Sequence, residues 1–220
     1  MQKPIAKLTV LGALIVAFSA QAAFVVQPVS GTESGNYNGR DISNAIDGSG
    51  LSASLAVVTD APVPATWPTH NNNWADEWWE GGDNGTPWMG FDLGDVYEIS
   101  GLYLWNDAAD GAVGGQGIKS FTVKVSSDAT EPADWSLISS IGSFSAAAGE
   151  ATTVTGEEFT LGSAADARWV RIDIASVHGN QIGSYSPIIG EIRFIAIPEP
   201  GSLALGLLGL GAVILRRRRA

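Results

Sequence analysis

Trp88-Met89-Gly90-Phe91-Asp92-Leu93, closed by Gly94-Asp95, is the clearest strand pattern in this chain. Large apolar side chains alternate along it with small or polar residues, and a glycine–aspartate pair follows as a turn signal. Alternation with a period of two is typical of a β-strand with one buried face. Because residues 24–197 contain no sustained helical period, this run predicts a domain built from strands.

Further runs of the same kind follow, separated by turns rich in glycine, asparagine and aspartate. They span residues 99–105, 118–126, 135–141, 151–161, 169–175 and 188–195. One helical turn is expected around Ser43 to Ile46. Short strands at this spacing predict an all-β sandwich, and a length of roughly 170 residues fits a single domain.

Five short segments carry a family resemblance. They are Asn44-Ala45-Ile46-Asp47-Gly48, Trp88-Met89-Gly90-Phe91-Asp92-Leu93-Gly94, Gly117-Ile118-Lys119-Ser120-Phe121-Thr122-Val123, Ala167-Arg168-Trp169-Val170-Arg171-Ile172 and Gly190-Glu191-Ile192-Arg193-Phe194. In this order they resemble the discoidin, or coagulation-factor C-type, domain, a galactose-binding-like jelly roll shared with a large class of bacterial carbohydrate-binding modules. The resemblance implies a jelly-roll β-sandwich over residues 24–197. The cysteine pair of animal members is absent, and the loop from Thr59 to Pro87 is longer than the family pattern.

The first 23 residues have the layout of a signal peptide. Lys3 and Lys7 form a positive region, residues 8–18 are apolar, and Ala20-Gln21-Ala22 offers the small-x-small pattern of signal peptidase. Cleavage is expected after Ala22 or Ala23, so the chain is predicted to be exported. Because the chain has no cysteine, its stability must come from core packing or a bound metal, and thiol chemistry is excluded.

The last 23 residues combine a helix breaker, an apolar segment and a positive cluster: Pro198-Glu199-Pro200, then Gly201 to Leu215, then Arg216-Arg217-Arg218-Arg219. The apolar segment would reach about 22 Å as a helix, short of a hydrocarbon core of roughly 30 Å. Four arginines mark the cytoplasmic side of a membrane. The arrangement resembles the PEP-CTERM sorting tail of exopolysaccharide-producing Gram-negative bacteria, which an exosortase cleaves near Pro-Glu-Pro. Residues 198–220 are therefore predicted to hold the chain transiently in the inner membrane; the alternative is an ordinary single-span anchor.

The charge of the predicted mature part excludes one class of partner. Between Phe24 and Ile197 the chain carries 22 acidic and six basic residues, a net charge of −16. Nucleic acid is excluded because phosphate binding needs a basic face. The charge favours divalent cations and neutral ligands, although acidity also keeps exported domains soluble.

The family resemblance implies a structural calcium ion. In many bacterial relatives one Ca²⁺ is held by an aspartate before a glycine, a hydroxyl residue five positions later and a glutamate near the C-terminal strand. Here these residues are Asp47, Ser52 and Glu191, with the backbone carbonyls of Ala45 and Gly50 as further ligands. Hard oxygen ligands suit Ca²⁺. The alternative is that Asp47 lies in a plain turn and Glu191 on the surface.

A tryptophan-rich segment occupies residues 58–87. Loops of this length are usually functional or disordered, and disordered segments are poor in aromatic residues, so an ordered loop is expected. The resemblance implies a sugar site at the loop end of the sandwich, where aromatic faces pack on sugar rings and polar groups bind hydroxyls. The candidates are Trp67, His70, Asn73, Trp74, Trp78, Trp79, Trp105, Asn106, His178 and Asn180.

The tryptophans have a competing interpretation as core residues. This interpretation is favoured for those in strand patterns, which are Trp88, Trp105, Trp135 and Trp169. For the tryptophans of the loop both interpretations stay open. Because Trp78 and Trp79 are adjacent, at most one of them is expected to point inward in an extended segment.

The predicted function is carbohydrate binding at the cell surface or in the exopolysaccharide matrix, with a glycan as partner and exosortase and signal peptidase acting during export. The alternative is a structural or adhesion protein of the matrix that binds other proteins through the same fold. A weaker alternative is a glycan-active enzyme, for which Asp76, Glu77, Glu80 and Asp83 offer carboxylate pairs. With two distant histidines and no nucleophile motif around a serine, no catalytic residue is assigned.

Overall fold

The computed structural model describes residues 22–53, 61–71, 73–81, 86–107, 116–147, 153–178 and 186–198. The chain divides into two compact units, of which residues 22–199 are one and the terminal segments 1–21 and 200–220 the other. The predicted signal peptide before Ala22 and the predicted sorting tail from Glu199 onward lie outside the described residues. None of the helices within the described ranges is long and apolar enough to cross a membrane.

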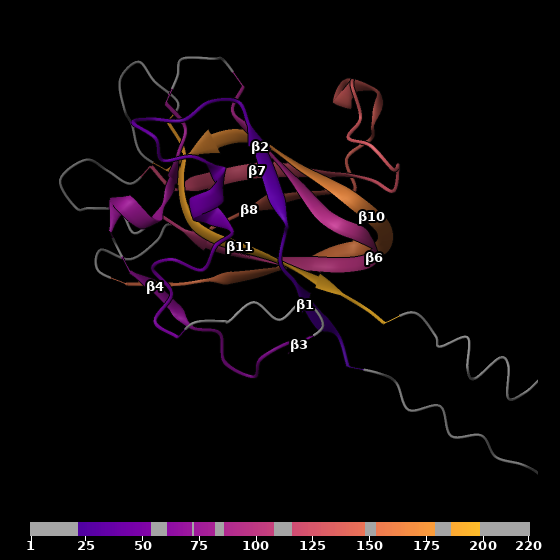
Figure 1. Cartoon of the computed structure of the whole chain (residues 1–220), viewed down its shortest axis with the longest axis horizontal. Coiled ribbons are helices and arrows are strands. Elements are labelled where there is room, and N and C mark those ends of the chain that lie inside the picture. Colours follow the sequence, from indigo (N-terminus) through magenta and orange to yellow (C-terminus); the bar gives the residue numbers. More distant parts are fainter. Residues whose placement is uncertain are drawn as a thin grey trace, which may run out of the picture. The chain divides into compact units, whose positions relative to one another are not determined.

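The described residues form strands joined by turns and three short 3-10 helices (Figure 1). The strands are β1 (Phe24–Val26), β2 (Ser30–Glu33), β3 (Ala61–Pro62), β4 (Thr69–Asn71), β5 (Trp78–Trp79), β6 (Trp88–Asn106), β7 (Ile118–Ser126), β8 (Gly142–Ser145), β9 (Thr153–Thr155), β10 (Glu157–Val177) and β11 (Ile188–Ala196). The 3-10 helices are η1 (Ile42–Ala45), η2 (Trp74–Asp76) and η3 (Trp135–Leu137). The predicted all-β fold is thereby confirmed.

Two long strands, β6 and β10, pass through both layers of the sandwich. Residues 88–92 of β6 pair with β2 on one side and with residues 169–173 of β10 on the other, and β7 and β8 extend this layer. Residues 99–106 of β6 pair with β11, whose other edge pairs with β1 and β5. Short β4 pairs with β9 as a separate ribbon. The strand pairs are antiparallel, as in a jelly roll.

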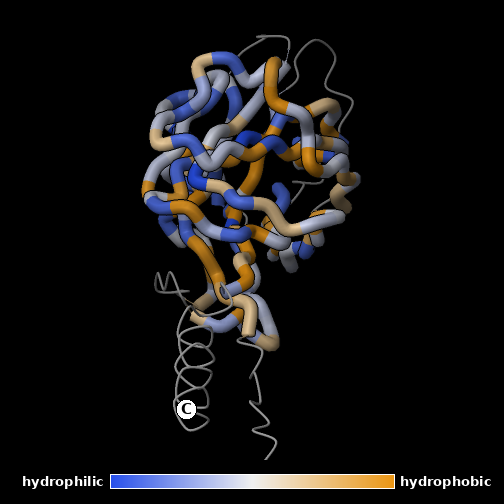
Figure 2. Tube along the Cα trace, turned by 90° about the vertical axis from the view of Figure 1, so that its right-hand side faces the viewer, coloured by the Kyte–Doolittle hydropathy of each residue, from blue (hydrophilic) through white to orange (hydrophobic). Residues whose placement is uncertain are grey.

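The core lies between the two layers. Phe91 of the first layer meets Phe194 of the second with ring centroids 5.5 Å apart, and Phe121 of β7 meets Phe159 at 5.2 Å. Along the strands hydrophobic and hydrophilic residues alternate (Figure 2), which buries one face of each strand. β11 is the exception, because all of its residues are buried. Burying each large apolar side chain contributes about 1.5–3 kcal/mol.

Two local expectations meet different outcomes. The helical turn expected near Ser43 is confirmed as η1, whose N-cap is Asp41. The strand expected over residues 135–141 is wrong, because the Asp134 side chain accepts the Ser136 N–H at 2.9 Å and starts η3 instead. Aspartate at an N-cap favours a helical turn over an extended chain.

The tryptophans expected in the core divide into two groups. Trp105 and Trp135 are buried, as expected. Trp88 and Trp169 are only half-buried, and an arginine guanidinium covers each ring: Arg171 lies 4.1 Å from the Trp88 centroid and Arg168 lies 5.5 Å from that of Trp169.

Candidate functional site

The tryptophan-rich segment covers the end of the sandwich where β6 ends and β11 begins. β5 pairs with β11 in the register Trp78↔Ile189 and Trp79↔Ile188. Trp78 is fully buried, and its indole N–H donates to the Glu33 carboxylate. Its prediction as a sugar-stacking residue is therefore wrong, because no face of the ring reaches solvent. Trp79 is half-buried, so one member of the pair points inward, as alternation predicts.

A tight turn places Tyr37 and Arg40 beside Trp79. Asn38 and Gly39 both have positive φ, 54° and 78°, and the Arg40 N–H donates to the Tyr37 carbonyl at 3.1 Å, as in a type I′ turn. The Tyr37 N–H donates to the Trp79 carbonyl at 2.8 Å, and the Trp79 N–H donates to the Arg40 carbonyl at 3.2 Å. Both backbone groups of Trp79 thus fix the turn to β5.

Four side chains converge at this turn, and we name Tyr37, Arg40, Trp74 and Trp79 the aromatic–arginine patch. The Arg40 guanidinium carbon lies 5.6 Å from the Trp74 ring centroid and 5.0 Å from that of Trp79, within cation–π range. The Tyr37 and Trp79 rings are 4.5 Å apart, and those of Trp74 and Trp79 are 5.9 Å apart. Tyr37 and Trp74 are each 43 % exposed, so the patch presents two aromatic rings to solvent.

The first residue of η2 is Trp74, and its neighbours hold it in place. The Asn73 side-chain oxygen accepts the Ala75 N–H at 3.2 Å and so caps η2. The amide groups of Asn71 and Asn73 each donate to Oδ2 of Asp76 at 3.0 Å. Asn73 is exposed beside the patch, but both ends of its amide are already engaged in this cap. Trp74 is therefore presented by an ordered helical turn.

A second aromatic cluster lies in a different part of the domain. The Trp67 ring stacks on Tyr103 at 4.1 Å and meets the edge of Trp105 at 5.5 Å. Trp105 is fully buried, and its indole N–H donates to the Pro68 carbonyl at 2.7 Å. Trp105 is therefore a core residue and is removed from the sugar-site candidates, whereas Trp67 is half-buried and packs on this cluster.

His70 is enclosed between two glycines. A Cβ at Gly50 would lie 2.4 Å from its Nε2, and a Cβ at Gly190 would lie 2.5 Å from its Nδ1. Nδ1 is 2.6 Å from the Asn71 carbonyl, and the side chain is fully buried. Burial lowers the pKa of His70 below its ordinary value, so the ring is neutral at neutral pH. Its prediction as a sugar ligand is wrong, because it fills the space that both glycines leave.

Asn106, at the end of β6, uses its whole amide inside the protein. Nδ2 donates to the carbonyls of Ile118 at 2.7 Å and Ala147 at 2.8 Å. Oδ1 accepts the Ile118 N–H at 2.7 Å and the Asp107 N–H at 3.1 Å. Two donors and two acceptor positions are all that an asparagine amide offers. No group remains for a sugar hydroxyl, so the prediction of Asn106 as a sugar ligand is wrong.

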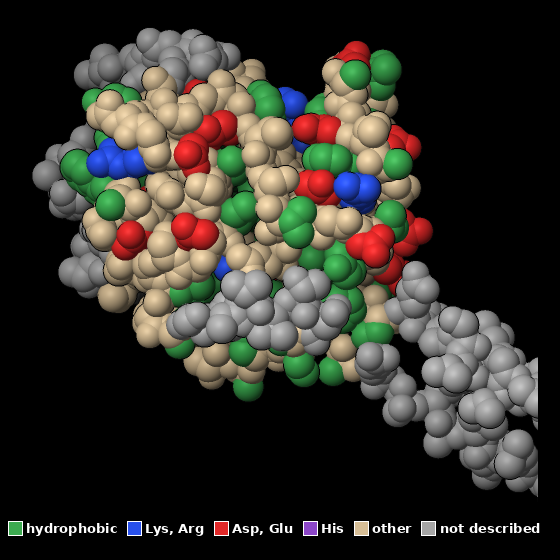
Figure 3. All heavy atoms as spheres, in the orientation of Figure 1, with side chains coloured by type: hydrophobic (Ala, Val, Ile, Leu, Met, Phe, Trp, Pro, Cys, Tyr) green, Lys and Arg blue, Asp and Glu red, His purple; other side chains and the backbone are tan. Residues whose placement is uncertain are grey.

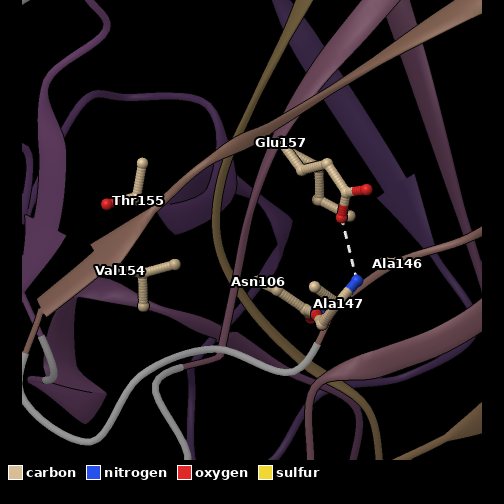
Figure 4. Close-up of a pocket in the computed structure, with 7 residues that line it drawn as sticks. Asn106, Ala146, Ala147, Val154, Thr155 and Glu157 are labelled. Atoms are coloured by element: carbon tan, nitrogen blue, oxygen red, sulfur yellow. Dashed lines mark hydrogen bonds between the residues drawn. The ribbon is translucent and has the colours of Figure 1, made fainter.

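A small cavity adjoins Asn106 (Figure 4). Its volume is about 30 Å³, which admits one or two water molecules but no sugar ring. Across it the Ala147 N–H donates to Glu157 Oε2 at 2.8 Å. His178, another predicted sugar ligand, is half-buried with Nε2 2.8 Å from the Ala146 carbonyl. Asn180 lies outside the described residues.

The predicted calcium ligands are partly brought together. The Gly48 N–H donates to Glu191 Oε2 at 2.8 Å, so the Asp47 loop meets the last strand. The Asp47 carboxylate accepts the Ser49 N–H at 2.7 Å, and the Ser52 hydroxyl accepts the Thr69 N–H at 3.1 Å. Glu191 is fully buried and not on the surface.

A guanidinium already faces the buried Glu191 carboxylate. Arg193, 1 % exposed, donates to Glu191 Oε1 and to the Ile192 carbonyl at 2.7 Å. No group of three or more acidic or histidine side chains that could hold a metal occurs in the described ranges. The carboxylate, hydroxyl and carbonyl oxygens of the predicted ligands are of the type that Ca²⁺ prefers. One of them, Glu191 Oε1, already accepts a hydrogen bond from Arg193.

The acidic residues of the tryptophan-rich segment that the structure describes are buried or already hydrogen-bonded. Glu77 and Glu80 are fully buried, and the Asp76 carboxylate accepts from two asparagines. Neither carboxyl oxygen of Glu77 has a hydrogen-bond partner among the described residues. Burial, with a smaller contribution from Asp107, raises the pKa of Glu77 to about 8. Asp83 lies outside the described residues.

Sequence reasoning missed Tyr37 and Arg40. Asn38-Gly39 between them is a strong dipeptide signal for a type I′ turn. That signal predicts a tight turn with Tyr37 and Arg40 at its two ends. It carries no information about Trp74 and Trp79, which complete the patch from a segment more than thirty residues later.

The comparison with protein families assigns this architecture. The F5/8 type C domain matches residues 29–188, and the PEP-CTERM protein-sorting motif matches residues 196–219. The chain belongs to the F5/8 type C, or discoidin, domain family. Curated proteins contain no match to the chain.

Solved structures share the fold at low sequence identity. A truncated AlyQ with CBM32 and alginate lyase domains is 17 % identical with a TM-score of 0.52, over 81 % of this chain but only 34 % of that one. The family 32 CBM of C. perfringens NanJ, in complex with galactose, is 13 % identical with a TM-score of 0.52, over 79 % of this chain and 99 % of that one. A fucolectin from Morone saxatilis serum is 16 % identical with a TM-score of 0.50, over 77 % of this chain and 45 % of that one.

Proposed function

We propose that the chain is an exported carbohydrate-binding module and that the aromatic–arginine patch is its sugar-binding surface. The observation that carries this proposal is the pair of exposed rings, Tyr37 and Trp74, on backbone that hydrogen bonds hold in place. Stacking on a sugar ring needs an exposed aromatic face, and a preordered face binds at lower entropic cost. Two structural neighbours, a family 32 CBM in complex with galactose and a fucolectin, support a carbohydrate as ligand.

The PEP-CTERM motif supports the proposed location. Signal peptidase would cut after Ala22 or Ala23, and an exosortase would cut near the Pro198-Glu199-Pro200 motif. The chain would then act at the cell surface or in the exopolysaccharide matrix of a Gram-negative bacterium. The intact mass of the protein recovered from the matrix tests both cuts.

Calcium is a further part of the proposal. Asp47, Ser52 and Glu191, with the carbonyls of Ala45 and Gly50, would hold Ca²⁺ and join the start of the domain to its last strand. The hydrogen bond between Gly48 and Glu191 supports this, since it already brings the two parts together. Bound calcium would, together with Arg193, balance the negative charge of the buried Glu191 carboxylate.

The test is retention of the full-length chain, in mild detergent, on the producing organism's exopolysaccharide. Trp74→Ala is expected to lower retention at least about fivefold, because one aromatic–sugar stack contributes roughly 1 kcal/mol or more. Leu137→Ala is the matched control, since Leu137 is an exposed apolar residue, 82 % exposed, at the separate helix η3. Equal loss in both variants would contradict a sugar site at the patch.

The test also separates the alternatives. Absence of retention for the unmodified chain would refute carbohydrate binding and favour a matrix structural or adhesion protein. The proposal is for binding without catalysis, so hydrolysis of reporter glycosides by the full-length chain would contradict it.

A further inference from the structure

Arg40 differs from most cationic side chains of the described residues because it forms no ion pair with any carboxylate in those ranges. Ion pairs are formed by Lys124, Arg168, Arg171 and Arg193. Within the described ranges no carboxylate forms an ion pair with Arg40. Its guanidinium lies against the rings of Trp74 and Trp79 instead.

Among the described residues, the carboxyl group coupled electrostatically to Arg40 is that of Glu77. Arg40 lowers the pKa of Glu77, but burial outweighs this effect and raises that pKa to about 8. Glu77 is therefore largely protonated at neutral pH and offers Arg40 little negative charge. In a chain of net charge −11, a guanidinium without an ion pair among the described residues is a local exception to the overall acidity. On the face shown in Figure 3, acidic side chains lie at several places and basic side chains at few.

Arg40 is half-buried, and within the described ranges its guanidinium donates no hydrogen bond to another residue. A guanidinium that stacks on aromatic rings uses its flat faces, while its N–H groups lie in the plane between those faces. This planar fork matches the two oxygens of a carboxylate, with which it forms paired hydrogen bonds. Hydrogen bonds to Tyr37 and Trp79 hold the Arg40 backbone, and contact with the Trp74 and Trp79 rings restrains its guanidinium, which lowers the entropic cost of binding a ligand.

We infer, on the basis of the carbohydrate-binding function proposed above, that the aromatic–arginine patch recognises an acidic polysaccharide. The carboxylate of a uronic acid residue pairs with the Arg40 guanidinium while the sugar ring packs on Trp74 or Tyr37. Because the acidic chain repels polyanions at long range, adsorption without a specific site is disfavoured. Binding of a polyuronate therefore reports a local site.

The experiment compares two polymers of the same sugar. Binding of the full-length chain, in mild detergent, is measured by calorimetry against polygalacturonate and against its methyl ester, in which each carboxylate is neutralised. The free carboxylate form is expected to bind at least about tenfold more tightly, because it can form a charge-assisted, paired hydrogen bond with Arg40 and the ester cannot. Arg40→Leu abolishes this preference, and Arg40→Lys, which keeps the charge but loses the planar fork, retains only part of it.

Lys119→Leu is the matched control, because Lys119 also has no ion pair in the described part of the chain and lies on β7. It is expected to leave the preference unchanged, and unaltered tryptophan emission verifies that each variant is folded. Equal binding of both polymers, unaffected by Arg40→Leu, would overturn this inference and leave the carbohydrate proposal standing. Binding of dextran sulfate without binding of polygalacturonate would overturn the assignment to a carboxylate. Failure to bind any polysaccharide, neutral ones included, would refute the proposed function as well.

Discussion

Replacing Asn106 by alanine is expected to destabilise the fold and not merely weaken ligand binding. Both backbone groups of Ile118 are bonded to the Asn106 amide, and Ile118 is fully buried. Each buried polar group left without a partner costs about 1–3 kcal/mol. The Ala147 carbonyl lies on an exposed residue, where water replaces the lost bond. The two Ile118 groups and the N–H of buried Asp107, at about 1 kcal/mol each, therefore set the loss in unfolding free energy at about 3 kcal/mol.

Urea unfolding of residues 24–197, which lie within one compact unit, measures this loss. With a slope of about 2 kcal/mol per molar urea, the unfolding midpoint is expected to fall by about 1.5 M. Asn106→Asp, which keeps the acceptor but loses both donors, should lose at least as much at neutral pH. Asn36→Ala is the control, because Asn36 is exposed and its side chain donates a hydrogen bond to the exposed end of Glu33 at 2.8 Å. An unchanged midpoint for Asn106→Ala together with lost glycan binding would refute the structural role and restore Asn106 as a ligand contact.

Two further predictions concern buried carboxyl groups. Unfolded, Glu77 ionises near its ordinary pKa of 4.5, whereas in the folded protein it stays protonated up to about 8, so its contribution to stability is lost as the pH rises between these values. Glu77→Gln should therefore raise the melting temperature relative to the unmodified protein progressively over this range, and a constant difference would contradict the buried neutral carboxyl. Calcium is expected to raise the melting temperature of residues 24–197 and a chelator to reverse this, with no effect in Glu191→Gln. A calcium effect that persists in Glu191→Gln would place the ion elsewhere.

Features that depend on neighbours along the chain could be predicted from the sequence. Apolar alternation marks β7, and Asp41 marks the start of η1. The length of β6 could not be predicted in this way, because a turn signal separates residues 88–93 from residues 99–105 although both belong to one strand. Gly94, with a φ of 84°, lets β6 bend there, and the Asp92 carboxylate accepts its N–H at 2.8 Å. In the sequence, the glycine–aspartate pair at which one strand bends from one layer to the other looks the same as a turn that joins two separate strands.

The candidate site depends on pairing between distant segments, which no local pattern records. Trp78 and Trp79 are chemically identical and adjacent, so alternation requires that they differ but does not say which one is buried. The pairing of β5 with β11 makes that choice, placing Trp78 inside against Glu33 and Trp79 outside beneath Arg40. A shift of that register by one residue would exchange the two roles and remove the support for Arg40. The site is therefore a property of one strand register, and a sequence search for sugar-binding residues must first establish the partner strand.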